Sequence, residues 1–100
     1  MTMPASQPDE VIHQPVRLKT LAALKALPRG SAIEFSRLRT LVGATDGNLG
    51  AHLASLERAG YVTLTKDFHA NKPRTRATLT PTGRRAFEAY VAYLQDLVGL

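Results

Sequence analysis

The chain has 100 residues, of which 44% are hydrophobic and 6% aromatic, so it suits one domain with a mainly aliphatic core. It carries 13 lysines and arginines against 8 acidic residues, a formal net charge of +5, and no cysteine. Disulfides, thiolate metal sites and thiol-based redox sensing are therefore excluded. No apolar run approaches the ~20 residues that span a bilayer, and the first ten residues lack the features of a signal peptide. These observations predict a cytoplasmic protein that makes no membrane contact.

The positive charge is concentrated in the second half of the chain. Between Arg58 and Arg85, Asp67 is the single acidic residue. Such a positive field favours a polyanion such as nucleic acid, although an ordinary solvated surface would have the same composition. The basic residues of this segment are Arg58, Lys66, Lys72, Arg74, Arg76, Arg84 and Arg85.

The first elements are predicted from prolines and apolar spacing. Residues 1–8 are polar and aperiodic, which predicts a disordered arm before a domain at about 9–98. Asp9 can cap one helical turn, and Pro15 suits the first position of a helix whose apolar stripe runs to about residue 27. A minor strand is expected at 32–34.

A second helix is predicted to begin with Ser36 as its cap and to end at Gly43. Serine accepts hydrogen bonds from the free amides of a first turn, and glycine readily adopts the left-handed conformation after the last turn. Phe35 is expected to pack just outside this helix. The residues expected to face inward are Leu38, Leu41 and Val42.

A third helix follows after a very short connection. Its predicted cap is Thr45 or Asp46, it occupies about 46–59, and Gly60 ends it. Its apolar stripe is expected to comprise Leu49, Leu53 and Leu56. Two amphipathic helices joined this closely are what a helix-turn-helix requires.

Two alternating, β-rich segments at 61–66 and 76–80 predict an antiparallel hairpin. The segment between them, 67–75, is longer than a plain hairpin turn. The sequence therefore predicts a unit at about 61–80 with a long basic loop that projects as a wing.

The last predicted helix, at about 81–98, follows a Thr80 cap and has Pro81 in its first position. At about 1.5 Å per residue it is about 27 Å long, and its apolar face is large for so small a domain to cover. We expect part of this face to pair with a second chain. The predicted dimerisation residues are Phe87, Tyr90, Val91, Leu94, Leu97 and Val98.

This order of elements predicts an α+β, mainly helical fold, and it resembles winged helix-turn-helix regulators of the MarR and ArsR type. Three segments carry the resemblance, and they are HQPVRL from His13, LGAHLASLERAGYV from Leu49 and LTPTGR from Leu79. The chain is most similar to small stand-alone winged-helix DNA-binding proteins related to MarR. The resemblance implies a transcriptional regulator that binds double-stranded DNA as a homodimer, with its long last helix serving dimerisation.

The exposed face of the third helix is predicted to enter the major groove. There Asn48 can pair with adenine, Ala51 can touch a thymine methyl, and Gly47 permits close approach. The face is poor in basic residues, and an ordinary exposed surface is the alternative interpretation. The other predicted DNA contacts of the two central helices are Ser36, Arg37, Thr45, His52 and Ser55.

The wing gives the stronger electrostatic argument for DNA. Arg74 is the predicted residue for the minor groove, and Lys72 and Arg76 are predicted to contact flanking phosphates. An exposed loop without function is the alternative.

Other functions find little support in the sequence. His13, His52 and His69 are far apart and lack an accompanying cluster of ligands, so no metal site is predicted. No nucleophile and base pair or phosphate-binding loop is present, so the chain is predicted not to be an enzyme and to need no cofactor. Two alternatives stay open, namely a winged helix that binds another protein and a regulator with a small-molecule effector held beside the last helix.

Overall fold

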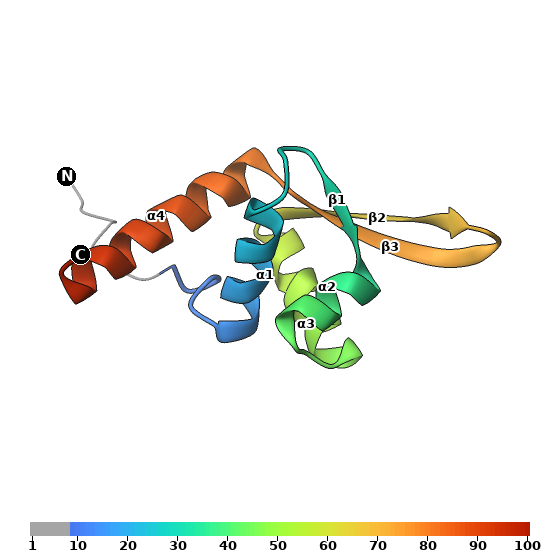
Figure 1. The fold of residues 1–100 in the computed structure, drawn as a ribbon, viewed down its shortest axis with the longest axis horizontal. Helices are drawn as coiled ribbons and strands as arrows, with labels where there is room; N and C mark the ends of the chain where they lie inside the picture. The colour runs from blue at the N-terminus through green and yellow to red at the C-terminus, as the bar shows by residue number, and fades with distance from the viewer. Residues whose placement is uncertain (1–8) are drawn as a thin grey trace.

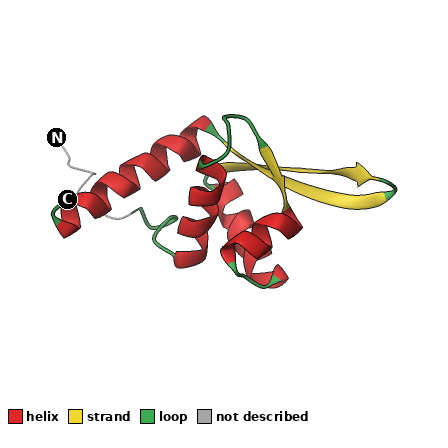
Figure 2. Cartoon of the chain, viewed as in Figure 1, coloured by secondary structure: helices red, strands yellow, loops and turns green. Residues whose placement is uncertain are grey.

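The computed structural model describes residues 9–100, and the arm predicted at 1–8 lies outside the described residues. Four helices and a small sheet follow one another in the predicted order, so the winged-helix fold is confirmed (Figure 1, Figure 2). The elements are α1 (Pro15–Lys25), β1 (Ala32–Glu34), α2 (Phe35–Val42), α3 (Asp46–Arg58), β2 (Val62–His69), β3 (Lys72–Leu79) and α4 (Pro81–Val98).

Helices α1, α2 and α3 pack around one aliphatic core. The predicted stripe of α3 is confirmed, because its three leucines are buried at 0 to 2% exposure. Before α1, Asp9 caps the predicted turn, since its Oδ1 accepts hydrogen bonds from the N–H groups of Val11 and Ile12 at 2.9 and 3.3 Å. That turn places Ile12, which is fully buried, beneath the helices.

The sheet has the strand order β1-β3-β2, and both pairings are antiparallel. Val62 lies opposite Leu79, and Leu64 lies opposite Ala77. Three of these four side chains are buried and Leu64 is partly buried, so this face of the sheet root closes the core. The remaining length of β2 and β3 extends past the helices as the wing (Figure 1).

Two predictions for α2 are wrong. The helix begins at Phe35 with Glu34 as N-cap, and no side chain caps it, so Ser36 lies inside the first turn. Strand β1 runs directly into the helix, and the Phe35 ring packs against the core, which draws the helix start two residues earlier than predicted. Leu41 is 57% exposed, because it lies about 100° around the helix from the buried Val42. The predicted end at Gly43 is confirmed, with φ of 70°.

The predicted long wing loop is also wrong. The strands continue until His69 lies opposite Lys72, and the tip consists of Ala70 and Asn71, whose φ angles are 52° and 64°. Two left-handed residues between paired strands are typical of a type I′ turn. Pro73 fits within β3 because β1 pairs only with residues 76–78, so its missing N–H costs no bond to that strand.

A close contact joins the wing root to α4. The Thr80 hydroxyl accepts a hydrogen bond from the Gly83 N–H at 2.9 Å and donates one to the Gly60 carbonyl at 2.6 Å. Gly83 lies directly against the Tyr61 backbone, where an added Cβ would be 2.8 Å from the carbonyl carbon. From this junction α4 runs to the end of the molecule opposite the wing (Figure 1).

Candidate nucleic-acid interface

The N-terminal part of α3 presents an exposed face of small residues. Thr45 caps the helix, as its hydroxyl accepts a hydrogen bond from the Asn48 N–H at 3.2 Å. Gly47, Asn48 and Ala51 are all exposed on the helix that follows. The structure therefore brings these predicted groove contacts together on one surface, and their contact with DNA stays a prediction.

Asp46, in the first turn of α3, is neutralised by a residue that the sequence did not single out. The Arg39 Nε on α2 lies 2.8 Å from the Asp46 Oδ1. The ion pair spans the turn between the two helices and offsets the negative charge that would otherwise repel a phosphate at this helix start. No pattern in the sequence indicated this pair.

Two predicted DNA contacts, His52 and Ser55, are engaged within the protein by α1. The Arg17 Nε donates a hydrogen bond to the His52 Nδ1 at 3.0 Å, and its Nη2 donates one to the Ser55 hydroxyl at 3.3 Å. Arg58 donates to the same hydroxyl at 3.1 Å. Arg17 also donates to the Val11 carbonyl at 3.1 Å, so one guanidinium joins α1 and α3 to the N-terminal segment.

Burial and the Arg17 contact together lower the pKa of His52. Burial is the main cause that lowers the pKa of His52, and the positive charge of Arg17 lowers it further. The neutral ring, which accepts the hydrogen bond on Nδ1, is therefore favoured in the folded protein.

We expect this lowered pKa to make the folded protein less stable in acid. The unfolded chain takes up a proton on His52 more readily than the folded one, so the stabilisation is complete above a pH of about 6.5 and is lost as the pH falls through the folded pKa. Urea unfolding of the wild type and of His52→Gln at pH 7.5 and 5.0 measures the effect. Glutamine supplies an acceptor for Arg17 without titrating, so the variant should lose less stability on acidification. An equal loss in both proteins would contradict the assignment.

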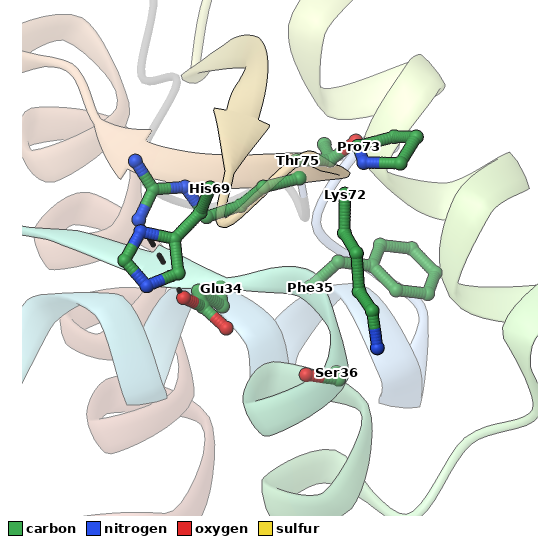
Figure 3. A pocket seen from close by; sticks show the side chains of 8 residues that line it. Glu34, Phe35, Ser36, His69, Lys72, Pro73 and Thr75 are labelled. Carbon is green, nitrogen blue, oxygen red and sulfur yellow. Dashed lines mark ion pairs between the residues drawn. The ribbon is translucent and has the colours of Figure 1, made fainter.

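Two of the wing arginines are held in ion pairs. The Arg74 Nε and Nη2 donate hydrogen bonds to the two carboxylate oxygens of Asp67 at 2.9 and 3.0 Å, and Arg76 donates to the same carboxylate at 3.1 Å. The Glu34 carboxylate lies 3.8 Å from the Arg74 Nη1, as the dashed line in Figure 3 marks. The Arg74 hydrogen bonds are the largest cause that keeps the pKa of Asp67 below its ordinary value. Arg74 stays a predicted minor-groove residue, but it must leave two carboxylates to reach DNA.

A groove of about 410 Å³ separates the wing from the start of α2. Figure 3 shows Lys72 extending from the wing toward Phe35 and Ser36, which begin α2. Among residues 9–100, Lys66 and Lys72 form no ion pair. Ser36 and Arg37 are exposed, as their predicted phosphate contacts require. The unpaired positive charge of the wing therefore resides on its lysines rather than on its arginines.

The N-terminal segment ties α4 to the wing root through two hydrogen bonds. The Tyr61 hydroxyl donates to the Asp9 Oδ2 at 2.7 Å, and the His13 Nδ1 lies 2.6 Å from the Tyr90 hydroxyl. Burial first, and then the hydrogen bond and charge of Asp9, raise the pKa of Tyr61 to about 12. The sequence indicated the Asp9 cap but neither of these long-range contacts.

The predicted dimerisation residues divide into two groups along α4. Tyr90 is buried at 5% exposure, and Phe87 and Leu94 pack against the core of the same chain. Leu97 and Val98, one turn further, are 67% and 65% exposed. The apolar stripe of α4 thus begins on the domain's own core and continues past it.

Residues 9–100 contain no cluster of three or more histidines or acidic residues arranged to hold a metal ion. Within the same range, no helix combines the length and apolar character needed to cross a membrane.

The chain matches a family model described as a winged helix DNA-binding domain over residues 16–98, and it belongs to this family. It is also 35% identical over 88 residues to the uncharacterised protein MJ0432 of Methanocaldococcus jannaschii. That match covers 88% of this chain and 92% of the archaeal protein.

Several solved structures with the same fold are described as transcriptional regulators. A transcriptional regulator homologue from Pyrococcus horikoshii OT3 has a TM-score of 0.80 and 27% identity, covering 91% of this chain and 87% of that one. The MepR protein of S. aureus, solved as a DNA complex, has a TM-score of 0.69 and 19% identity, covering 90% of this chain and 74% of that one. A MarR-family regulator from Silicibacter pomeroyi is among these neighbours, so the fold that the predicted resemblance implies is confirmed. The family and the fold are those of transcriptional regulators rather than enzymes.

Proposed function

We propose that this protein is a sequence-preferring regulator that binds double-stranded DNA as a homodimer. In this proposal α3 enters the major groove and the wing contacts phosphates and the adjacent minor groove. The observation that carries the proposal is the exposed small-residue face of α3 beside a wing with unpaired lysines. MepR, which shares the fold, was solved as a DNA complex, and this supports DNA as the partner.

On α3, Asn48 is the proposed base reader and Gly47 and Ala51 allow the helix to approach the base edges closely. The neutralised Asp46 leaves the helix start compatible with a phosphate, and Thr45 is the proposed contact there. His52 and Ser55 position α3 through Arg17 in this proposal.

On the wing, Lys66 and Lys72 are the proposed phosphate contacts. A lysine with no carboxylate partner can bind a phosphate without losing an ion pair within the protein. Arg74 and Arg76 must first break their ion pairs with Asp67. The arginines then serve mainly to hold the wing in shape.

The second chain is proposed to pack on the exposed end of α4. Leu97 and Val98 extend the apolar stripe beyond the core of their own chain. A two-fold axis through α4 would set two recognition helices about one DNA turn apart, roughly 34 Å.

Binding titrations at several salt concentrations test the proposal, on a random duplex and on a duplex selected by the protein from a random library. We expect replacement of Lys66 and Lys72 by alanine to flatten the slope of log affinity against log salt by about 2 for each chain that contacts the duplex, on both duplexes. Asn48→Ala should weaken binding to the selected duplex by about ten-fold and leave the random duplex unchanged.

The control variant is Lys25→Ala, which removes a positive charge that is paired with Glu88 on the α4 side of the domain. Its salt slope should match the wild type. Absence of salt-sensitive binding by the wild-type protein would overturn the proposal and favour a protein partner for the same surfaces.

A further inference from the structure

Phe68 lies near the wing tip without a structural role in the fold. Its side chain is 74% exposed, and its cross-strand partner is Pro73, which is also exposed. Together they form an apolar pair, which the His69 and Lys72 pair separates from the two-residue turn. An aromatic side chain at this exposure adds little to folding, because it remains in contact with water.

The pleat of the hairpin assigns this pair to a definite face. Side chains alternate along β2, so Phe68 shares a face with Lys66, Leu64 and Val62. Nearer the root that face closes the core, and toward the tip it continues uncovered. The ion-paired residues Asp67 and Arg74 lie on the opposite face, and so does Lys72, which is the cross-strand partner of His69.

The residues around Phe68 favour a binding partner whose surface is anionic and contains an apolar groove. Lys66 and Lys72 form no ion pair among residues 9–100, whereas the Asp67 carboxylate is occupied by two arginines. An apolar protein surface would remove water from these lysines without offering them a negative charge. A partner surface with charged groups alone would leave Phe68 in contact with water. A DNA groove offers phosphates at its rims and apolar base-pair steps between them.

We propose that Phe68, backed by Pro73, is an apolar wedge that enters the minor groove and partly unstacks a base-pair step. Lys66, on the face of Phe68, and Lys72, on the opposite face next to the tip, hold phosphates on the two sides of the wedge. This inference rests on the proposed DNA-binding function and adds that the wing deforms the DNA. The wing would then bind best at the base-pair step that unstacks most easily. It would thereby contribute to sequence selection without forming hydrogen bonds to bases.

The test uses the full chain and duplexes of the selected sequence in which 2-aminopurine replaces one adenine at a time. Unstacking at the wedge should raise the fluorescence at one or two neighbouring steps with the wild type. Phe68→Ala should bind about ten-fold more weakly with an unchanged salt slope, and at saturation it should lose the fluorescence rise. Phe68→Leu, which keeps an apolar side chain, should retain most of the rise.

The outcomes separate this inference from the function on which it rests. Wild-type binding without a fluorescence rise at any step, or a rise that persists in Phe68→Ala, would overturn the wedge and leave DNA binding intact. Failure of the wild type to bind either duplex would overturn the proposed function itself. Because Phe68 is exposed, urea unfolding of both variants should match the wild type, so that loss of folding does not account for the result.

Discussion

Replacing Gly83 by alanine should destabilise the protein by about 3 kcal/mol, a large share of the roughly 5–15 kcal/mol by which domains are stable. Gly83 lies in the first turn of α4, where alanine has the higher helix propensity and would by itself add about 0.5–1 kcal/mol. The close contact with Tyr61 outweighs that gain. A Cβ would meet three atoms of the Tyr61 backbone, two of them at 2.8 and 2.9 Å and the carbonyl oxygen closer still.

The Tyr61 backbone is unable to move aside cheaply because it is held from both directions. Its carbonyl accepts a hydrogen bond from the Thr80 N–H at 3.1 Å, and its side chain is bonded to Asp9. Relief of the clash therefore separates α4 from the wing root and disrupts the Thr80 cap of Gly83. Urea unfolding followed by circular dichroism measures the loss.

The matched control is Gly50→Ala in α3, where an added Cβ meets no atom within 4 Å. The same substitution there should leave the protein as stable as the wild type or stabilise it by about 0.5–1 kcal/mol. If Gly83→Ala and Gly50→Ala had the same urea midpoint, the close packing of α4 on the wing root would be wrong.

The contrast between these two glycines illustrates what the sequence predicts. The sequence located most helices and strands well, because capping residues and the spacing of apolar residues depend on neighbours within a few positions. Thr80 was predicted as a cap and Thr45 as one of two candidates with Asp46, and both threonines accept the expected hydrogen bond. Both glycines lie in helices, but only the assembled structure distinguishes the one beneath a neighbouring strand.

Where local signals competed, the sequence misplaced an element. Pro73 and the polar run around it predicted a long loop, yet the strands pair as far as the Ala70–Asn71 turn. Cross-strand pairing and the Arg74 ion pair with Asp67 outweigh the weak strand propensity of the segment. Similarly, the serine at 36 was a good cap in isolation, but β1 places the N-cap two residues earlier, at Glu34.

The sequence predicted which residues of the candidate interface are exposed, but not which of its basic residues form ion pairs. Exposure of Gly47, Asn48 and Ala51 follows from the helical period of α3. Which basic residues are unpaired depends instead on contacts between distant elements, such as that of Glu34 with Arg74. Counting charges along the chain therefore located the basic residues of the wing, but it did not distinguish its ion-paired arginines from its lysines.

The second large effect is expected at the end of α4, where Leu97→Glu should abolish the proposed dimer. In the single chain Leu97 is 67% exposed, so a carboxylate there should cost little folding stability. Between two chains the same carboxylate would be buried without a partner, which is far more costly. Light scattering should therefore show a mass near 10.9 kDa, that of one chain, instead of twice that value.

Loss of the dimer should also weaken DNA binding selectively. Two linked recognition helices bind a duplex with two half-sites about 100-fold more tightly than one does, because the second contact is intramolecular. Leu97→Glu should lose this advantage and bind a duplex with a single half-site as the wild type does.

The control for added charge is Ala92→Glu, at an exposed position of α4 about 140° around the helix from Phe87. It introduces the same carboxylate on the same helix, away from the apolar stripe, and should keep both the wild-type mass and the two-site affinity. A Leu97→Glu protein that kept the dimer mass would show that the second chain packs elsewhere. The exposed stripe of Leu97 and Val98 would then need another apolar partner, since a charge at Leu97 would have cost the assembly nothing.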